Sequence, residues 1–129
     1  MILKGREFEI FRDAVLKMAL DVQELGATFK KVRFYLHEYT QEISPWDGFS
    51  LTAYYDKSGI YMPHKSYKLP IYRKFNRYRA FKDNYIYSDD FNRLVDLLSK
   101  GRRDYKAVFS HDEFKIMKDE SVILTCPFI

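Results

Sequence analysis

The chain has 129 residues, of which 47% are hydrophobic and 31% are charged, and its formal net charge is +4. A chain of this length buries roughly two thirds of its unfolded surface, and this composition excludes disordered and fibrous proteins. We therefore expect a single globular domain over residues 1–129.

The sequence also limits where the protein resides. No apolar run approaches the roughly 18 residues needed to cross a bilayer, and the first residues lack a secretory signal pattern. One cysteine, Cys126, excludes an internal disulfide framework and fits a reducing compartment. We expect a cytoplasmic protein with no membrane partner.

Aromatic residues make up 18% of the chain, with eleven Tyr, eleven Phe and one Trp. Tyrosine combines a large apolar ring with a polar hydroxyl, and it is enriched at recognition surfaces. This composition favours a half-exposed sheet or a binding surface over an enclosed catalytic pocket.

The first predicted element is a helix over residues 6–25. Its apolar residues recur at spacings of three and four, which places them on one face of a helix: Phe8, Phe11, Val15, Met18, Val22 and Leu25. Gly26 follows as the expected C-cap.

Three strands are predicted to follow the helix. Apolar and polar residues alternate over 32–37 and again over 49–55, which predicts strands, and the turn-forming residues 44–48 (Ser-Pro-Trp-Asp-Gly) separate them. Residues 56–59 predict a hairpin turn, and residues 60–62 predict a third strand that Pro63 interrupts. All connections are short, so these strands should be antiparallel.

Residues 63–87 fit both a strand and a helix, and the sequence leaves the choice open. Ser88 is the expected N-cap of a second helix near residues 88–100, with Asp89 and Asp90 in its first turn and Gly101 at its end. Its core residues are predicted to be Phe91, Leu94, Val95 and Leu98.

Short β-rich runs at 105–109, 114–117 and 122–126 close the chain. The whole order, without a regular βαβ alternation, predicts an α+β fold. We expect a two-layer domain in which an antiparallel β-sheet is packed by the N-terminal helix and by the helix near residues 88–100.

No catalytic or metal-binding motif is present. His37, His64 and His111 have no metal-ligand spacing, and we interpret them as surface or turn residues. Residues 111–113 (His-Asp-Glu) are expected to form a polar hairpin turn rather than an acid–base cluster. Cys126 has no adjacent base and is interpreted as a buried structural cysteine. We predict no enzymatic activity, no catalytic residue, no cofactor and no metal.

The strongest compositional feature is the segment 65–82, which carries seven basic residues and no acidic one. Aromatic residues are interleaved with these charges, so the segment can pair with phosphates and stack on bases, or it can bind an acidic protein surface. A solvated strand or helix face is the third interpretation. The predicted partner-binding residues are Lys65, Lys68, Tyr72, Arg73, Lys74, Arg77, Tyr78, Arg79 and Lys82, together with Trp46 in the turn at 44–48.

The chain resembles a known family in the order of its elements. The residues that carry the resemblance are the leading helix, Trp46-Asp47-Gly48-Phe49, the run 85–90 (Tyr-Ile-Tyr-Ser-Asp-Asp), the helix 91–99 and residues 114–116. Together they look like the YezG-like small immunity proteins of bacterial polymorphic toxin systems.

This resemblance implies a cytoplasmic inhibitor that binds a cognate toxin domain and blocks its active site or substrate entry. Many such proteins are acidic, whereas this chain has a pI near 9.1. The contacted toxin surface is therefore expected to be acidic, or the contact is expected to lie away from the basic segment. A small basic nucleic-acid-binding module that uses the segment 65–82 is the alternative.

Overall fold

The computed structural model describes residues 2–25, 29–39, 46–54, 64–68, 84–101 and 104–129. Within these ranges the chain order is β1 (Ile2–Leu3), α1 (Arg6–Leu25), β2 (Lys31–Tyr39), β3 (Trp46–Tyr54), β4 (His64–Lys68), β5 (Asn84–Tyr87), α2 (Ser88–Ser99), β6 (Lys106–Phe109), β7 (Glu113–Lys118) and β8 (Ser121–Pro127). Neither helix in these ranges is both long enough and apolar enough to span a bilayer.

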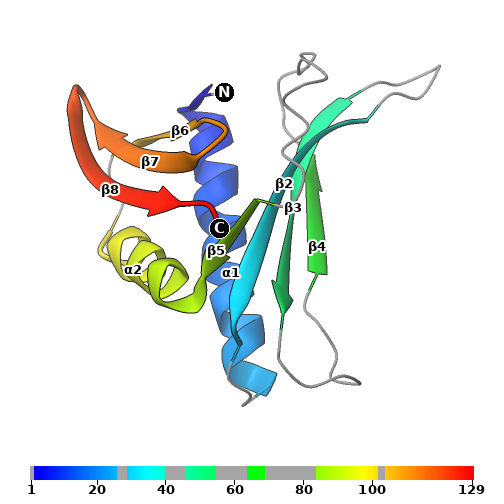
Figure 1. The fold of residues 1–129 in the computed structure, drawn as a ribbon. Helices are drawn as coiled ribbons and strands as arrows, with labels where there is room; N and C mark the ends of the chain where they lie inside the picture. The colour runs from blue at the N-terminus through cyan, green and yellow to red at the C-terminus, as the bar shows by residue number, and fades with distance from the viewer. Residues whose placement is uncertain (1, 26–28, 40–45, 55–63, 69–83, 102–103) are drawn as a thin grey trace.

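The strands form two antiparallel sheets of four strands each. Their orders are β1-β6-β7-β8 and β4-β3-β2-β5, and α1 lies between the two sheets (Figure 1). The predicted α+β class, with antiparallel strands packed by an N-terminal helix and a second helix, is confirmed. The sequence suggested one sheet, whereas β6, β7 and β8 pair with one another as a second sheet, to which β1 adds an edge strand through its long-range pairing with β6.

Several predicted boundaries differ from the structure. The strand Ile2–Leu3 was not expected, and β3 begins at Trp46, inside the predicted turn 44–48. Residues 46–48 pair with residues 39–37 of β2, so cross-strand pairing outweighs the turn preference of Asp47 and Gly48. The predicted strand at 60–62 lies outside the described residues. Within the open segment 63–87, residues 64–68 and 84–87 form the strands β4 and β5, and residues 63 and 69–83 lie outside the described part.

Helix α2 starts one residue earlier than its predicted cap implies. Tyr87 is the N-cap and makes no side-chain capping hydrogen bond, whereas Ser88 is already helical. The Ser88 N–H donates to the Lys30 carbonyl at 3.0 Å instead, because β5 runs directly into the helix beside the start of β2. The helix ends as predicted, with Gly101 at a φ of 110° just after the C-cap Lys100.

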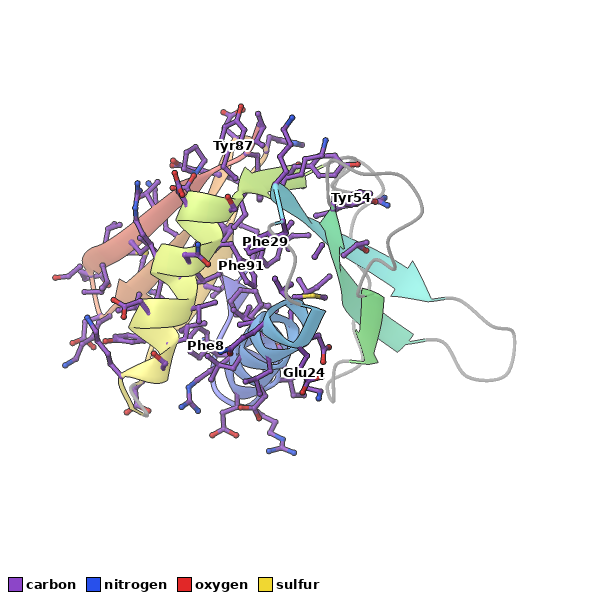
Figure 2. The ribbon with its side chains drawn as sticks, turned by 90° about the horizontal axis from the view of Figure 1, so that it is seen from below. Phe8, Glu24, Phe29, Tyr54, Tyr87 and Phe91 are labelled. Atoms are coloured by element: carbon purple, nitrogen blue, oxygen red, sulfur yellow. The ribbon has the colours of Figure 1, made fainter. Side chains whose placement is uncertain are left out.

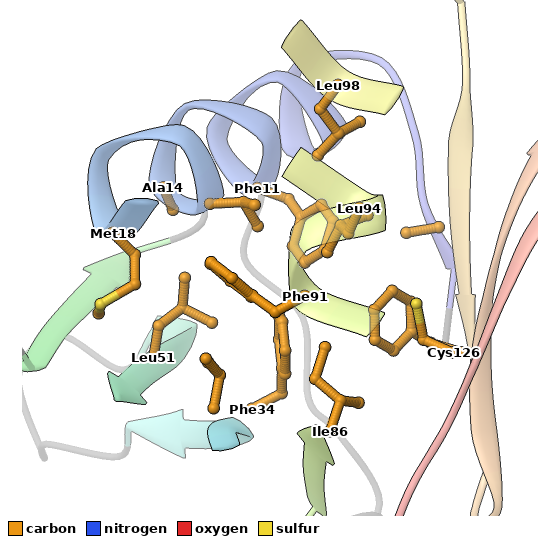
Figure 3. Packing of buried hydrophobic residues seen from close by; sticks show 14 of the residues in the cluster. Phe11, Ala14, Met18, Phe34, Leu51, Ile86, Phe91, Leu94, Leu98 and Cys126 are labelled. Carbon is orange, nitrogen blue, oxygen red and sulfur yellow. The ribbon is translucent and has the colours of Figure 1, made fainter. Parts of the chain in front are cut away.

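The core is centred on Phe11 of α1. Its ring centroid lies 6.1 Å from that of Phe34 in β2, 5.8 Å from Phe109 in β6 and 6.2 Å from Phe114 in β7. Phe34 and Phe114 also contact each other, with centroids 5.2 Å apart. Figure 3 shows Phe11 among the buried side chains of both helices. Phe11, a member of the apolar stripe predicted from the sequence, therefore contacts both sheets.

A two-residue segment after β8, Phe128–Ile129, links the two sheets through the backbone. The Phe128 N–H donates to the Asp112 carbonyl and the Ile129 N–H donates to the Tyr85 carbonyl, both at 2.8 Å. The first bond leads to the β7 side and the second leads to β5. We call Phe128–Ile129 the strap, and Figure 1 shows the end of the chain beside β5.

Candidate functional site

Three of the predicted binding residues lie in strands of the described part of the chain. Lys65 and Lys68 lie in β4, and Trp46 is the first residue of β3. The other predicted residues lie outside the described part of the chain: Tyr72, Arg73, Lys74, Arg77, Tyr78, Arg79 and Lys82. The prediction of a binding surface in 65–82 therefore stays a prediction.

The register of β4 bears on how its two lysines are arranged. Lys65 pairs with Leu51, a buried residue of β3, whereas Lys68 pairs with Gly48. Successive residues of a strand alternate between the two faces of a sheet, and these lysines are three positions apart. Their register positions therefore belong to opposite faces of the sheet.

The residues considered for catalysis occupy separate places. His37 lies in β2 and His64 begins β4, where a loop was expected, whereas His111 is exposed in the turn between β6 and β7. The predicted polar turn at 111–113 is confirmed, with Glu113 already the first residue of β7. Among the described residues, no three His, Cys, Asp or Glu side chains are close enough to hold a metal ion.

Cys126 is a buried cysteine, as predicted. It is fully buried in β8, and burial raises the pKa of its thiol to about 12, with a further increase from the Asp90 carboxylate and an opposing effect of the Arg93 guanidinium. A thiol with such a pKa is protonated at neutral pH and is a poor nucleophile. Its position explains its burial, because it pairs with Phe114 of β7 in the core.

An aromatic and cationic cluster lies where β2, β3 and β5 run side by side. The Lys31 Nζ lies 4.3 Å from the ring centroid of Tyr85 and 5.9 Å from that of Tyr54. The two tyrosine rings meet edge to face, with centroids 5.5 Å apart. All three side chains are partly buried. We call Lys31, Tyr54 and Tyr85 the tyrosine–lysine cluster.

The strand register explains why these side chains meet. Lys31 of β2 pairs directly with Tyr54 of β3 on one side and with Tyr87 of β5 on the other, while Tyr85 is its diagonal neighbour on β5. Direct and diagonal cross-strand neighbours are within reach of long and aromatic side chains. The two tyrosine rings therefore come from β3 and β5, the strands on either side of β2. The ammonium group of Lys31, the first residue of β2, lies against both rings.

Beside this cluster, the start of α2 forms a hollow of about 520 Å³. We call this cavity the α2 hollow; its lining residues are Phe29, Lys30, Tyr87, Ser88, Asp89, Asp90 and Arg93. Tyr87 is 52% exposed and belongs both to the hollow and to the row of Lys31. Figure 2 shows Tyr87 and Tyr54 on the same side of the molecule, and Phe29 against Phe91.

The charges of the α2 hollow are mixed. Arg93 donates to the Asp90 carboxylate at 3.0 Å, whereas Asp89 and Lys30 are exposed. Two acidic and two basic residues therefore line this cavity, and Lys31 follows Lys30 as the first residue of β2. Such a surface suits a partner that carries both signs of charge.

A second cavity, of about 550 Å³, lies at the start of α1. Its lining combines three basic, three acidic and two aromatic residues with one glycine: Lys4, Gly5, Phe8, Glu9, Arg12, Asp104, Tyr105, Lys106 and Asp119. Arg12 is already engaged, because its Nε donates to the Leu98 carbonyl at 3.1 Å and ties α1 to the end of α2. Phe8 and Tyr105 contact each other edge to face. Arg12, Phe8 and Tyr105 therefore have structural contacts in this cavity, which gives no support to a catalytic site there.

Sequence reasoning missed the tyrosine–lysine cluster. The alternation of residues 32–37 places Lys31 at a strand end, but nothing local shows that β5 pairs with β2 rather than with another strand. The useful signal was the run Tyr85-Ile86-Tyr87, whose alternation marks a strand with two tyrosines on one face.

Comparisons with known proteins give no further guide to this surface. No family model matches the chain, and neither the curated proteins nor the solved structures contain a significant match.

Proposed function

We propose that this protein is a non-enzymatic protein-binding inhibitor whose contact surface includes the tyrosine–lysine cluster, Tyr87 and the α2 hollow. Its most specific form is a cytoplasmic immunity protein that neutralises a cognate bacterial toxin domain by blocking its active site or substrate entry. The observation that carries the proposal is the half-exposed Tyr87 beside Lys31 and Arg93. Tyrosine and arginine are the residue types most enriched among interface hot spots.

The geometry of the cluster favours a protein partner over a nucleic acid. Single-stranded nucleic acids stack their bases on aromatic rings that offer an open face. The Tyr85 ring already contacts the Lys31 ammonium group, 4.3 Å from its centroid, and the Tyr54 ring, with the two ring centroids 5.5 Å apart. The exposed Asp89 carboxylate at the start of α2 also repels a phosphate backbone. A folded surface of mixed charge fits this arrangement better than a polyanion does.

The direct test uses a toxin domain encoded next to this gene in its host. Co-expression should restore the growth that the toxin domain suppresses, and the purified proteins should form a complex. Replacing Tyr87 by Ala should weaken that complex by about tenfold to thirtyfold, because a buried aromatic anchor contributes roughly 2 kcal/mol to binding. Tyr87 is half exposed in the unbound protein, so the variant should remain folded.

Ile123→Ala is the matched control, since Ile123 is 44% exposed but lies in β8 on the other sheet. An unchanged affinity for Tyr87→Ala would contradict the proposed surface. Failure of the protein to bind or neutralise any neighbouring toxin domain would contradict the immunity function. Binding of single-stranded RNA or DNA that weakens steeply with salt would favour the nucleic-acid alternative.

A further inference from the structure

The strap connects the two sheets at the strand that supplies Tyr85. β5 has four residues and is an edge strand, paired with β2 on one side. On its other side, the Tyr85 carbonyl accepts a hydrogen bond from the Ile129 N–H at 2.8 Å. The residue that carries the Lys31 contact is therefore held from both sides.

The other half of the strap is fixed to the opposite sheet. The Phe128 N–H donates to the Asp112 carbonyl, and the Phe128 ring lies 5.9 Å from that of Phe114 in β7. Phe114 is fully buried, so Phe128 rests on the core rather than on a mobile surface. Because Phe128 is held in place by these contacts, the direction of the backbone N–H of Ile129 is also fixed.

We infer that Ile129 is a positioning residue for the proposed binding surface, because its backbone N–H holds β5 so that the Tyr85 ring lies against Lys31 and Tyr54. This inference rests on the proposed function for its biological meaning. The positioning itself is a property of the unbound protein. The Ile129 side chain is 52% exposed, so the backbone N–H rather than the side chain performs this role.

A four-residue edge strand needs such support. A short edge strand with one neighbour opens readily, because it has few backbone hydrogen bonds and one paired side. The side chain of Tyr85 is a diagonal neighbour of Lys31, and a diagonal pair has a longer backbone separation than a direct pair. A small displacement of β5 therefore breaks the Lys31–Tyr85 contact before it breaks the pairing of the strands.

The test removes the N–H and keeps the chain length. Ile129→Pro lacks a backbone N–H, whereas Ile129→Val retains it and is the conservative rescue. The readout is the NMR signal of the Lys31 ε-methylene group, which the Tyr85 ring shields in the unbound wild-type protein. Tyr85→Leu defines the position of that signal when the ring is absent.

In Ile129→Pro the Lys31 signal should move most of the way to its position in Tyr85→Leu, while Ile129→Val should keep the wild-type position. Protection of the Phe128 amide against hydrogen exchange should persist in Ile129→Pro, which would show that the other half of the strap stays in place. An unchanged Lys31 signal in a folded Ile129→Pro protein would overturn the inference.

If Ile129→Pro does not fold, the wild-type protein provides a second measurement. On gradual heating, the Ile129 amide should lose protection over the same temperature range as Lys31 loses its ring shielding. Loss of Ile129 protection with full retention of that shielding would equally overturn the inference. Neither measurement involves a partner, so failure of the positioning role is distinguishable from failure of the proposed function.

Discussion

Replacing Phe11 by Ala should be among the most destabilising single changes in this protein. Phe11 is 1% exposed, and its ring lies within 6.2 Å of those of Phe8, Phe34, Phe109 and Phe114. Truncation of a buried phenylalanine costs about 3–5 kcal/mol. A protein of this size has a total stability of roughly 6–19 kcal/mol. The variant should therefore lose a large fraction of the free energy of unfolding.

Equilibrium unfolding in urea measures this loss. With a slope near 2 kcal/mol/M, which is typical for small proteins, the midpoint should fall by about 2 M. Leu20→Ala is the matched control on the same helix, because Leu20 is 54% exposed, and its effect should stay within about 0.5 kcal/mol. If Phe11→Ala costs no more than Leu20→Ala, the assignment of Phe11 as a central core residue in contact with both sheets is refuted.

A double-mutant cycle tests the same reasoning more narrowly. Phe11→Leu and Phe34→Leu each keep an apolar side chain but remove one ring of the contact between α1 and β2. The coupling energy should be about 0.5–1.5 kcal/mol, as for other aromatic pairs. Additive effects of the two changes would indicate that the rings fill volume without a specific contact.

Two further predictions concern Cys126 and Asp119. The Cys126 pKa is raised from 9.0 to about 12 in the folded protein, so its contribution to stability is complete below pH 9 and is lost as the pH rises toward 12. The free energy of unfolding, measured from pH 8 to 12, should therefore decline less for Cys126→Ala than for the wild type. Parallel declines would contradict the raised pKa. Asp119, between β7 and β8, has a φ of 53°, a conformation that costs a residue other than glycine about 1 kcal/mol. Asp119→Gly should therefore raise the midpoint of thermal unfolding, and Asp119→Val should lower it. The reverse order of the two midpoints would show that the turn is not strained.

The sequence predicted the elements whose signals are local. The spacing of Phe8, Phe11 and Val15 predicted α1 over its full observed length, and the apolar positions Phe91, Leu94 and Leu98 of α2 are buried as expected. The three closing strands were also found, because alternation and turn residues are visible within a few positions. The predicted end of α2 at Gly101 is confirmed for the same reason.

What the sequence did not predict depends on contacts between distant segments. The strand Ile2–Leu3 exists because β6 lies beside it, and the extension of β3 back to Trp46 follows from its pairing with Tyr39 of β2. Likewise, the tyrosine–lysine cluster needs β2 to lie between β3 and β5, and no pattern in either strand specifies that neighbour. The side chains of the candidate site were therefore visible in the sequence, but their proximity was not.

The pairing of β1 with β6 determines when during synthesis this protein can fold. Leu3 pairs with Ala107, about 100 residues later in the chain, and α1 follows β1 directly. At roughly 5–20 residues per second, a ribosome needs about 5–20 s to make the intervening chain. For much of that interval α1 is already synthesised, but the sheet β1-β6-β7-β8 that covers part of its apolar face is not yet complete. The nascent protein thus exposes an amphipathic helix for seconds, and its folding must be completed late in translation or after it.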